Sequence, residues 1–388
     1  MSIDFNNTEI AFAHKSDKEL RDAYQLFKAM NIPALVNLGS SITAWALNKG
    51  FPIETPVRLT IFNQFCGGRN IEECKSHIED LSKHGIRTIL DYGVEGKQDE
   101  AALDETAKYL TETLEYAKSE PGVNILSIKI TGLFPDELLV KFGKEAAFTE
   151  DEQAQWQRGK DRVSRICSAA YDSDIQLYFD AEESWVQEAI DALVMEQMEE
   201  FNKHKSIVFN TIQLYRHDRL AYLKSSFEKA QTGRYILAVK LVRGAYMEKE
   251  RIRAKSENRP SPIQASKEAT DNDYNEALRF CMEHLSRINF CNATHNEDSC
   301  RLLTELVQAA DIPNDHPHIL TAQLYGMGEN LSFNMAKEGL AVAKYMPYGP
   351  VREVVPYLIR RAQENTSADG TMSRELNLLK KEMKRRGL

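Results

Sequence analysis

Short apolar segments alternate with longer amphipathic segments over most of this 388-residue chain. The short segments are rich in β-branched and aromatic residues and are apolar on both faces, which is typical of parallel strands that helices connect. Eight candidate strands follow this pattern, and the last is followed by a helix-length segment over 339–364. The candidate strands are 57–65, 87–92, 125–131, 175–181, 207–213, 236–245, 288–294 and 319–324. Eight such units favour a TIM-like (β/α)8 barrel over a doubly wound sheet.

The chain on either side of this barrel is predicted to be helical. Residues 1–56 have apolar residues at helical spacing and form an N-terminal helical arm, which ends at Phe51-Pro52. The barrel then spans 57–367, and residues 368–388 form a basic helical tail in solvent. This order predicts one large barrel domain between two helical extensions.

Two connections within the barrel, 132–165 and 247–275, are longer than a bare barrel needs. The second is polar, contains two prolines and follows a strand on the face where barrel enzymes bind substrate. Lids are often drawn from such loops, so this connection is a candidate lid, with a solvated insertion as the alternative.

Charge and cysteine usage exclude several classes of protein. The net charge of −9 argues against general nucleic-acid binding, which needs a basic surface. The six cysteines form no CxxC pair and no zinc-like spacing with histidine, so we expect reduced thiols and no metal site. The N-terminus has no apolar export signal, and no apolar run is long enough to span a bilayer. A cytoplasmic protein is predicted, and a peripheral contact with the inner face of a membrane, for instance through the basic tail, is left open.

Polar residues follow six consecutive candidate strands, where a barrel carries its chemistry. They include Lys129, Asp180, Gln213, Lys240, Arg243, Thr294, His295, Asn296 and Gln323. Each also has a structural explanation. Lys129 could pair with Asp180, Asp180 or Asn296 could cap the helix that follows, and Gln213 could bond loop backbone. Their gathering at one rim nevertheless indicates a functional site.

A second polar group lies on the predicted helix near the C-terminus. Tyr357, Arg360, Arg361 and Glu364 recur at i, i+3, i+4 and i+7, so they share one helix face. Two guanidinium groups suit the binding of a carboxylate, because each presents a planar fork of donors. The alternative is an exposed helix on which Glu364 pairs with the arginines.

A dinucleotide fingerprint of the GxGxxG type is absent from the sequence, which argues against a Rossmann site. A nucleotide cofactor would have to lie across the mouth of the barrel. Its phosphates would then lie near Thr294-His295 and near Gly244-Ala245, where small residues let backbone amides approach.

Four segments carry a family resemblance: FDAEE at 179–183, LVRGAYMEKE at 241–250, ATHN at 293–296 and KYMPYGPVREVVPYLIRRAQEN at 344–365. Over about 57–367 the chain resembles the proline dehydrogenase family. The resemblance implies an FAD-dependent (β/α)8 barrel that oxidises L-proline to Δ1-pyrroline-5-carboxylate in proline catabolism and passes the electrons to membrane quinone. The absence of an aldehyde-oxidising or DNA-binding segment predicts the monofunctional form.

The resemblance also implies residue roles. Arg360, Arg361 and Lys129 would hold the substrate carboxylate, and Asp180 and Lys240 would be catalytic, with Asp180 balancing the cations. The residues implied to pack the substrate ring are Tyr345, Tyr357, Tyr246 and Leu324. The residues implied to bind FAD are Ala181, Gln213, Lys240, Val242, Arg243, Gly244, Ala245, Thr294, His295, Asn296 and Glu364.

One position departs from the pattern of many bacterial members. They have arginine where this chain has Lys240 and lysine where it has Arg243, so KLVR looks like the eukaryotic branch. Lysine supplies positive charge near the flavin but cannot make bidentate contacts, which affects the flavin potential rather than the reaction class.

Three other functions remain open at this point. Hydroxyproline oxidation is disfavoured by Tyr345, because members that prefer hydroxyproline tend to have a smaller residue there. An aldolase-type barrel could use Lys129 as a Schiff-base lysine. A non-catalytic, carboxylate-binding barrel is the third alternative.

Overall fold

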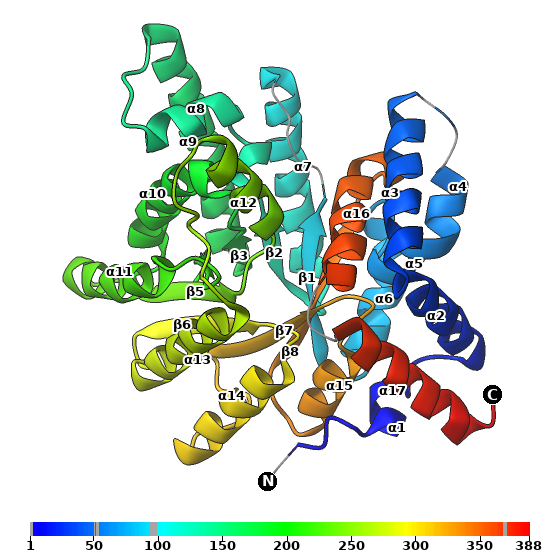
Figure 1. The fold of residues 1–388 in the computed structure, drawn as a ribbon. Coiled ribbons are helices and arrows are strands. Elements are labelled where there is room, and N and C mark those ends of the chain that lie inside the picture. The colour runs from blue at the N-terminus through cyan, green and yellow to red at the C-terminus, as the bar shows by residue number, and fades with distance from the viewer. Residues whose placement is uncertain (1–2, 50, 52–53, 94–98, 368–370) are drawn as a thin grey trace. The chain divides into compact units, whose positions relative to one another are not determined.

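The computed structural model describes residues 3–49, 51, 54–93, 99–367 and 371–388. Its parallel strands form a closed barrel in the order β1 to β8, with helices between them, as Figure 1 shows. The strands are β1 Ile86–Tyr92, β2 Val123–Ile128, β3 Gln176–Phe179, β4 Val208–Gln213, β5 Leu237–Val242, β6 Ile288–Ala293, β7 Ile319–Leu324 and β8 Val342–Tyr348. The predicted TIM-like (β/α)8 class is therefore confirmed.

The helices alternate with the strands and extend beyond them at both ends. Those before β1 are α1 Thr8–Ala11, α2 Asp17–Met30, α3 Pro33–Asn48, α4 Glu54–Val57, the π-helix η1 Arg58–Phe62, α5 Asn63–Phe65 and α6 Ile71–Ser82. Those from β1 to β5 are α7 Glu100–Ser119, the 3-10 helix η2 Ile130–Gly132, α8 Asp136–Gly143, α9 Glu150–Ser173, α10 Ser184–Phe201 and α11 Arg219–Gly233. After β5 come α12 Met247–Ser256, α13 Lys267–Glu283, α14 Glu297–Ala309, α15 Glu329–Lys337, α16 Val351–Ser367 and α17 Thr371–Arg386.

The predicted strand over 57–65 is wrong, because this segment is helical. It runs through α4, η1 and α5, with Val57, Phe62 and Phe65 buried and Leu59 exposed to solvent. Its β-branched and aromatic residues resemble those of a strand, but burial of one helical side against the core outweighs that weak local preference.

The strand β8 was missed by the sequence pattern, which placed it within a helix-length segment. It pairs in parallel with β1, from Ile86 opposite Val342 to Tyr92 opposite Tyr348. Two residues, Lys344 and Pro347, interrupt its apolar run. Lys344 is fully buried, and its Nζ lies 3.0 Å from Oε2 of Glu329 and donates to the Met327 carbonyl at 2.7 Å. The count of eight strands was therefore correct only because one false strand replaced one missed strand.

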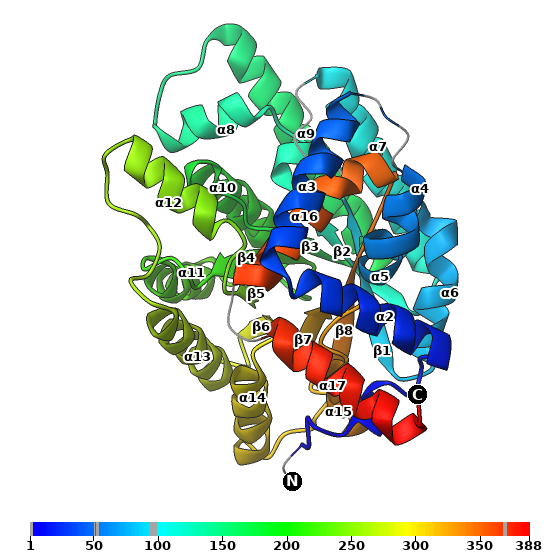
Figure 2. The same cartoon turned by 45° about the vertical axis from the view of Figure 1, so that its right-hand side comes forward.

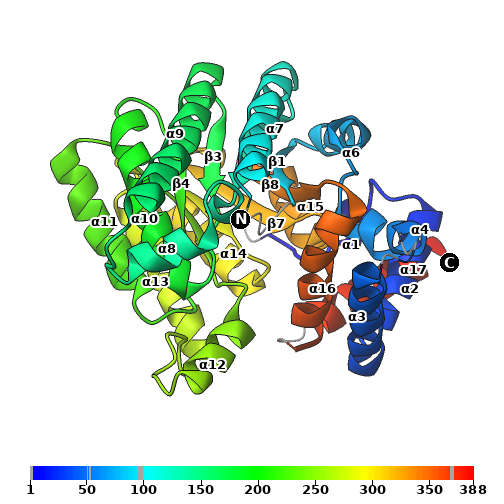
Figure 3. The same ribbon diagram turned by 90° about the horizontal axis from the view of Figure 1, so that it is seen from above.

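The chain divides into two compact units, which are described separately. Unit 1 comprises Met1–Gly93 with Ala322–Leu388, and unit 2 comprises Val94–Thr321. In unit 2 helices lie outside the strands, as Figure 3 shows for α9 against β3 and α10 against β4. In unit 1, α3 lies against α16 and α17 against α2 (Figure 2).

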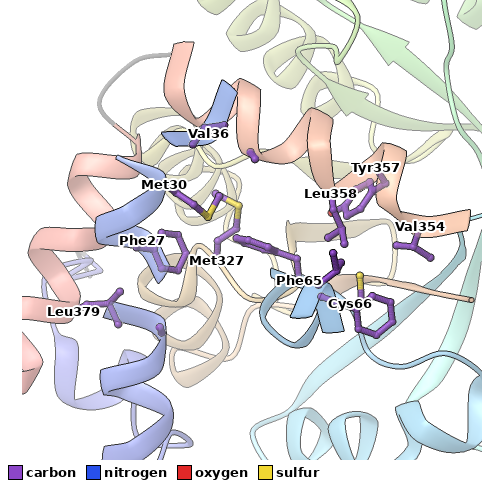
Figure 4. Close-up of a cluster of buried hydrophobic side chains, with 14 of the residues drawn as sticks. Phe27, Met30, Val36, Phe65, Cys66, Met327, Val354, Tyr357, Leu358 and Leu379 are labelled. Atoms are coloured by element: carbon purple, nitrogen blue, oxygen red, sulfur yellow. The ribbon is translucent and has the colours of Figure 1, made fainter. Parts of the chain in front are cut away.

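Unit 1 has an apolar cluster to which its N-terminal and C-terminal helices both contribute. Phe27 and Met30 of α2, Tyr357 of α16 and Leu379 of α17 are all part of it, as Figure 4 shows. The prediction of a solvated C-terminal tail is therefore wrong, because α17 buries Leu379 in this cluster. The division into arm, barrel and tail remains a prediction.

The basic residues at the end of α17 make contacts within the fold. Glu382 is buried and accepts hydrogen bonds from Arg385 and Arg386. Burial would raise the pKa of Glu382, but these two guanidinium groups hold it below its ordinary value. Arg386 also donates to the carbonyls of Phe12 and Lys15 at 2.7 and 2.8 Å. These bonds fasten the last turn of α17 to the segment between α1 and α2.

A second buried carboxylate, Glu375, fastens the start of α17. It accepts a hydrogen bond from the Gly328 amide, and burial raises its pKa to about 7 although that bond opposes the shift. Because the folded pKa exceeds the unfolded value of 4.5, the unfolded chain loses this proton first as pH rises. Stability from this group is therefore complete below about pH 4.5 and is lost as pH rises through about 7.

We expect Glu375→Gln to stabilise the protein above pH 7 by on the order of 3 kcal/mol, because glutamine keeps the acceptor oxygen without a buried charge. The difference from the natural chain should vanish near pH 4.5. Urea unfolding at both pH values measures it, with Glu338→Gln, an exposed carboxylate, as the control. A variant that is less stable at high pH would contradict this account.

Candidate active site

A buried charge cluster lies where β2 and β3 of unit 2 end. Asp180 follows β3, and its two carboxylate oxygens contact Lys129, which follows β2, and Lys240 within β5. The Lys129 Nζ lies 3.3 Å from Oδ2, and Lys240 bonds Oδ1. The side chains of Lys129, Asp180 and Lys240 are only 8%, 13% and 6% exposed. The predicted pairing of Lys129 with Asp180 is confirmed.

The strand ladder explains why these three side chains meet. The Asp180 amide donates to the Ile128 carbonyl at 2.8 Å, which continues the β2–β3 pairing and sets Asp180 beside Lys129. Ser127 adds a hydrogen bond from its Oγ to Oδ1 of Asp180 at 2.8 Å. Two ammonium groups therefore share one carboxylate away from bulk water. Such a site favours an anion, since Coulomb attraction is strong at low dielectric.

Glu182 is a buried carboxyl group to which the sequence assigned no role. It accepts hydrogen bonds from the Thr131 hydroxyl at 2.6 Å and the Thr131 amide at 3.2 Å. Burial raises the pKa of Glu182 to about 8, although the hydrogen bonds from Thr131 and the charge of Lys129 lower it. The only signal in the sequence was a second acidic residue in FDAEE, which is as common on exposed loops.

Gln213, at the end of β4, lies beside the Glu182 backbone. Its Nε2 donates to the Glu182 carbonyl at 2.9 Å, so the structural explanation considered for Gln213 is confirmed. Its Oε1 is buried and accepts no hydrogen bond from the part of the chain that the structure describes. A buried acceptor without a donor costs about 1–3 kcal/mol, so this atom fits a ligand that donates an N–H, such as a flavin ring.

Arg243, just after β5, connects α13, α14 and the residue Thr294 that precedes α14. Its Nε donates to Asp271 at 2.7 Å, its Nη1 to Thr294 at 2.7 Å and its Nη2 to Ser299 at 3.0 Å. Its guanidinium carbon also lies 4.3 Å from the centre of the Tyr274 ring. The side chain is therefore held rigidly by protein contacts.

The turn that follows Arg243 exposes backbone. Gly244 has φ +135°, and a Cβ there would come within 2.4 Å of the Tyr215 ring, so only glycine fits. Gly244 and Ala245 are exposed, and backbone at such a turn can approach a phosphate closely. The turn and the fixed Arg243 together fit the pyrophosphate of a dinucleotide. Val242, the last residue of β5, immediately precedes Arg243.

Thr294, His295 and Asn296 lead into α14. Asn296 is the N-cap of this helix, and its side chain accepts from the Ser299 amide at 2.9 Å, as one alternative predicted. Thr294 receives the bond from Arg243 described above. Asp180, in contrast, does not cap α10: the N-cap position there is Glu183.

The helix α12 contacts the start of α10. This start follows Asp180 and Ala181 closely in the sequence. Glu250 is fully buried and accepts from the amide and the hydroxyl of Ser184 at 2.6 and 2.7 Å. Lys249 pairs with Glu183 at 2.6 Å. The connection that was a candidate lid thus contains an ordered helix, whose preceding residue Tyr246 is buried. Its role as a lid remains a prediction.

In unit 1, Tyr357 and Arg361 lie side by side on the helix α16, as their spacing predicted. Tyr357 is buried in the apolar cluster, and the guanidinium carbon of Arg361 lies 5.6 Å from the centre of its ring. Burial raises the pKa of Tyr357 to about 12, although the charge of Arg361 opposes this. Arg360 and Arg361 are half-buried. Glu364 lies in α16, but its side chain is outside the described residues.

Tyr345 and Leu324 lie on the neighbouring strands β8 and β7 of the same unit. The Tyr325 amide, next to Leu324, donates to the Tyr345 carbonyl at 2.8 Å. Both side chains are half-buried. An apolar wall from these two residues is consistent with their position.

Comparison with known proteins identifies the family. The family model for proline dehydrogenase matches residues 74–374. A carbapenem antibiotics biosynthesis protein, CarD, from Pectobacterium carotovorum is 33% identical over 83% of this chain and 83% of its own length. Proline dehydrogenase 1, mitochondrial, from Dictyostelium discoideum is 31% identical over 98% of this chain and 74% of its own length. The chain belongs to the proline dehydrogenase family. It is an oxidoreductase that acts on proline, as the four quoted segments predicted.

A solved structure supports the fold of this proline dehydrogenase family member. Proline utilization A from Bdellovibrio bacteriovorus, inactivated by N-propargylglycine, has a TM-score of 0.73 and 20% sequence identity over 93% of this chain. The chain spans 38% of that protein's length. At this identity the likeness shows the barrel fold and not the residue roles.

Proposed function

We propose that this chain oxidises L-proline to Δ1-pyrroline-5-carboxylate with bound FAD and passes the electrons to a membrane quinone. The observation that supports it best is the buried cluster of Lys129, Asp180 and Lys240. Its two buried ammonium groups suit an amino-acid carboxylate and a cofactor that gains negative charge on reduction. The substrate class follows from the family.

Gln213 and Lys240 are proposed to contact the flavin ring, and Arg243, Gly244 and Ala245 the pyrophosphate. Ala181, Val242 and the three residues before α14, Thr294, His295 and Asn296, would complete the site, with Glu364. Two features support these assignments. The buried Gln213 Oε1 accepts no hydrogen bond from the described residues, and the turn at Gly244 exposes its backbone. When bound, FAD supplies the acceptor for the hydride that leaves proline.

The protein's own contribution is to bind, orient and exclude water. We assign the carboxylate of proline to Arg360, Arg361 and Lys129, since charge-assisted bonds to guanidinium are strong and directional. Tyr345, Tyr357, Tyr246 and Leu324 are assigned to the substrate ring. If proline binds with a neutral nitrogen, its lone pair forms the C=N bond as the hydride leaves Cδ, and no protein base is needed. Lys240 then offsets the negative charge that the site gains, while Asp180 keeps both lysines in place.

The ion pair between Lys129 and Asp180 weighs against the aldolase alternative. A Schiff-base lysine must be neutral to attack a carbonyl, and a carboxylate at 3.3 Å favours the charged form. Tyr345 supports proline over hydroxyproline, because the extra hydroxyl needs room at that position.

An absorbance spectrum of the purified protein tests the proposal. We expect a flavin band that bleaches when L-proline is added without oxygen and returns when a quinone is added. A colourless protein, or a flavin band that L-proline leaves unchanged, would contradict it. Borohydride trapping of a carbonyl compound on Lys129 would favour the aldolase instead.

Within the described residues, no helix is long and apolar enough to cross a bilayer. Independently of this finding, we propose a cytoplasmic location and peripheral contact with the membrane that holds the quinone.

A further inference from the structure

Exposed large apolar side chains are concentrated in one part of unit 1. Nine such residues are described, and seven of them lie between Ile32 and Leu59; the other two, Met247 and Ile252, are on α12. Scattered exposed apolar residues need no explanation, but a contiguous group on one element marks an interaction surface.

Four of these residues form a stripe along α3, which we call the α3 stripe: Leu35, Leu38, Ile42 and Trp45. They recur at i, i+3, i+7 and i+10, so they share one face of the helix. Their exposed fractions lie between 51% and 60%. Another side of α3 is already packed, since Val36 is buried in the apolar cluster with Met30 and Leu358 (Figure 4). The helix is thus held to unit 1 while its stripe faces solvent.

The polar residues of α3 indicate what covers the stripe. No Asp, Glu, Lys or Arg occurs in its 16 residues, and its exposed polar side chains include Asn37 and Ser41. Protein interfaces usually have a polar rim with directional bonds, which a helix without charges supplies poorly. A row of exposed bulky apolar residues on one helix face is typical of helices that lie in the lipid interface. Trp45 stacks on Phe51 at 5.3 Å between ring centres, and such aromatic residues favour the headgroup level.

We infer that the α3 stripe is a docking surface for the interface of a phospholipid bilayer, held by apolar insertion rather than by charge. The inference rests on the proposed function in one respect, that a membrane quinone is the electron acceptor. Within unit 1, α3 packs against α16, which bears Arg360 and Arg361. Docking through the stripe therefore brings the helix proposed to bind substrate close to the membrane that holds the quinone.

The basic C-terminal segment is a poorer membrane element than the α3 stripe. Arg385 and Arg386 are paired with Glu382, and Arg386 also pairs with Asp17 at 3.1 Å. Binding through that segment would need anionic lipid and would weaken steeply with salt. Binding through the uncharged stripe should need no anionic lipid and should not weaken steeply with salt.

Flotation of the full-length protein with phosphatidylcholine vesicles tests the inference, at low and at high salt. We expect the natural chain to float with the vesicles in both, with little gain from added phosphatidylserine. The double variant Leu38→Ser, Ile42→Ser should lose at least about tenfold in vesicle partitioning, because two inserted side chains become polar without any change of charge. The matched control, Met247→Ser with Ile252→Ser on α12, removes the same kind of exposed side chain and should float like the natural chain.

Proline oxidation with a soluble dye, measured without vesicles, separates this inference from the proposed function. The stripe variant should keep its dye-linked activity, which also shows that it is folded. Vesicle binding without any proline activity would contradict the proposed function but would still support the docking surface. The inference is overturned if the natural chain does not float, or if the stripe variant floats equally well. Conversion of a dimer to a monomer by the variant, without vesicle binding by the natural chain, would identify a second copy as the occupant.

Discussion

Replacing Asp180 by asparagine is expected to lower kcat/KM for L-proline by about 10²–10³-fold, the usual effect of removing one preorganised electrostatic group. Asparagine keeps the shape of the side chain but removes the charge that Lys129 and Lys240 share. Both ammonium groups then lose the carboxylate that they share, and breaking a buried ion pair destabilises a fold by up to about 3–5 kcal/mol. Dye-linked kinetics and urea unfolding measure the two effects separately.

Ser127→Ala is the matched control for Asp180→Asn. It removes one hydrogen bond to the same carboxylate, at 2.8 Å, and leaves all three charges. We expect a loss of about 1 kcal/mol in stability and a small change in kinetics. Natural activity in Asp180→Asn would show that the charge cluster is structural and would remove the main support for the proposed site.

Replacing Arg361 by methionine is expected to raise KM for L-proline by about 10–100-fold, because a hydrogen bond to a charged group contributes about 1.5–3 kcal/mol. Methionine keeps an unbranched apolar stem beside the Tyr357 ring, so the packing of α16 should survive. The flavin content should be unchanged, which the ratio of flavin to protein absorbance measures.

Arg352→Met is the control on the same helix. Arg352 forms an exposed ion pair with Glu54 at 2.7 Å, and exposed pairs contribute little. Its KM should match that of the natural chain. An unchanged KM in Arg361→Met would show that residues other than Arg361 bind the carboxylate of proline.

The candidate site was partly predictable, because its residues lie at fixed points of a repeating pattern. Lys129 and Asp180 were placed at strand ends by the apolar runs before them, and parallel strands bring such ends together. Tyr357 and Arg361 were placed on one face by helical spacing alone. The bond between Lys240 and Asp180 and the contacts of Arg243 with Asp271 and Ser299 were not predictable, because their partners come from distant segments.

The sequence by itself determined the alternation of strands and helices, because burial imposes a local period on apolar residues. Tertiary structure decided the segments in which a polar residue is buried or an apolar one is exposed. Lys344 lies within β8 only because Glu329 balances its charge there and the Met327 carbonyl accepts a hydrogen bond from it. The segment over 57–65 is helical because its core contacts lie on one side, and α17 is packed because Glu375 and Glu382 find donors in distant parts of unit 1 and within the helix itself. Local patterns report how often a residue type is buried, whereas the free energy of a buried charge depends on a partner that only the folded chain supplies.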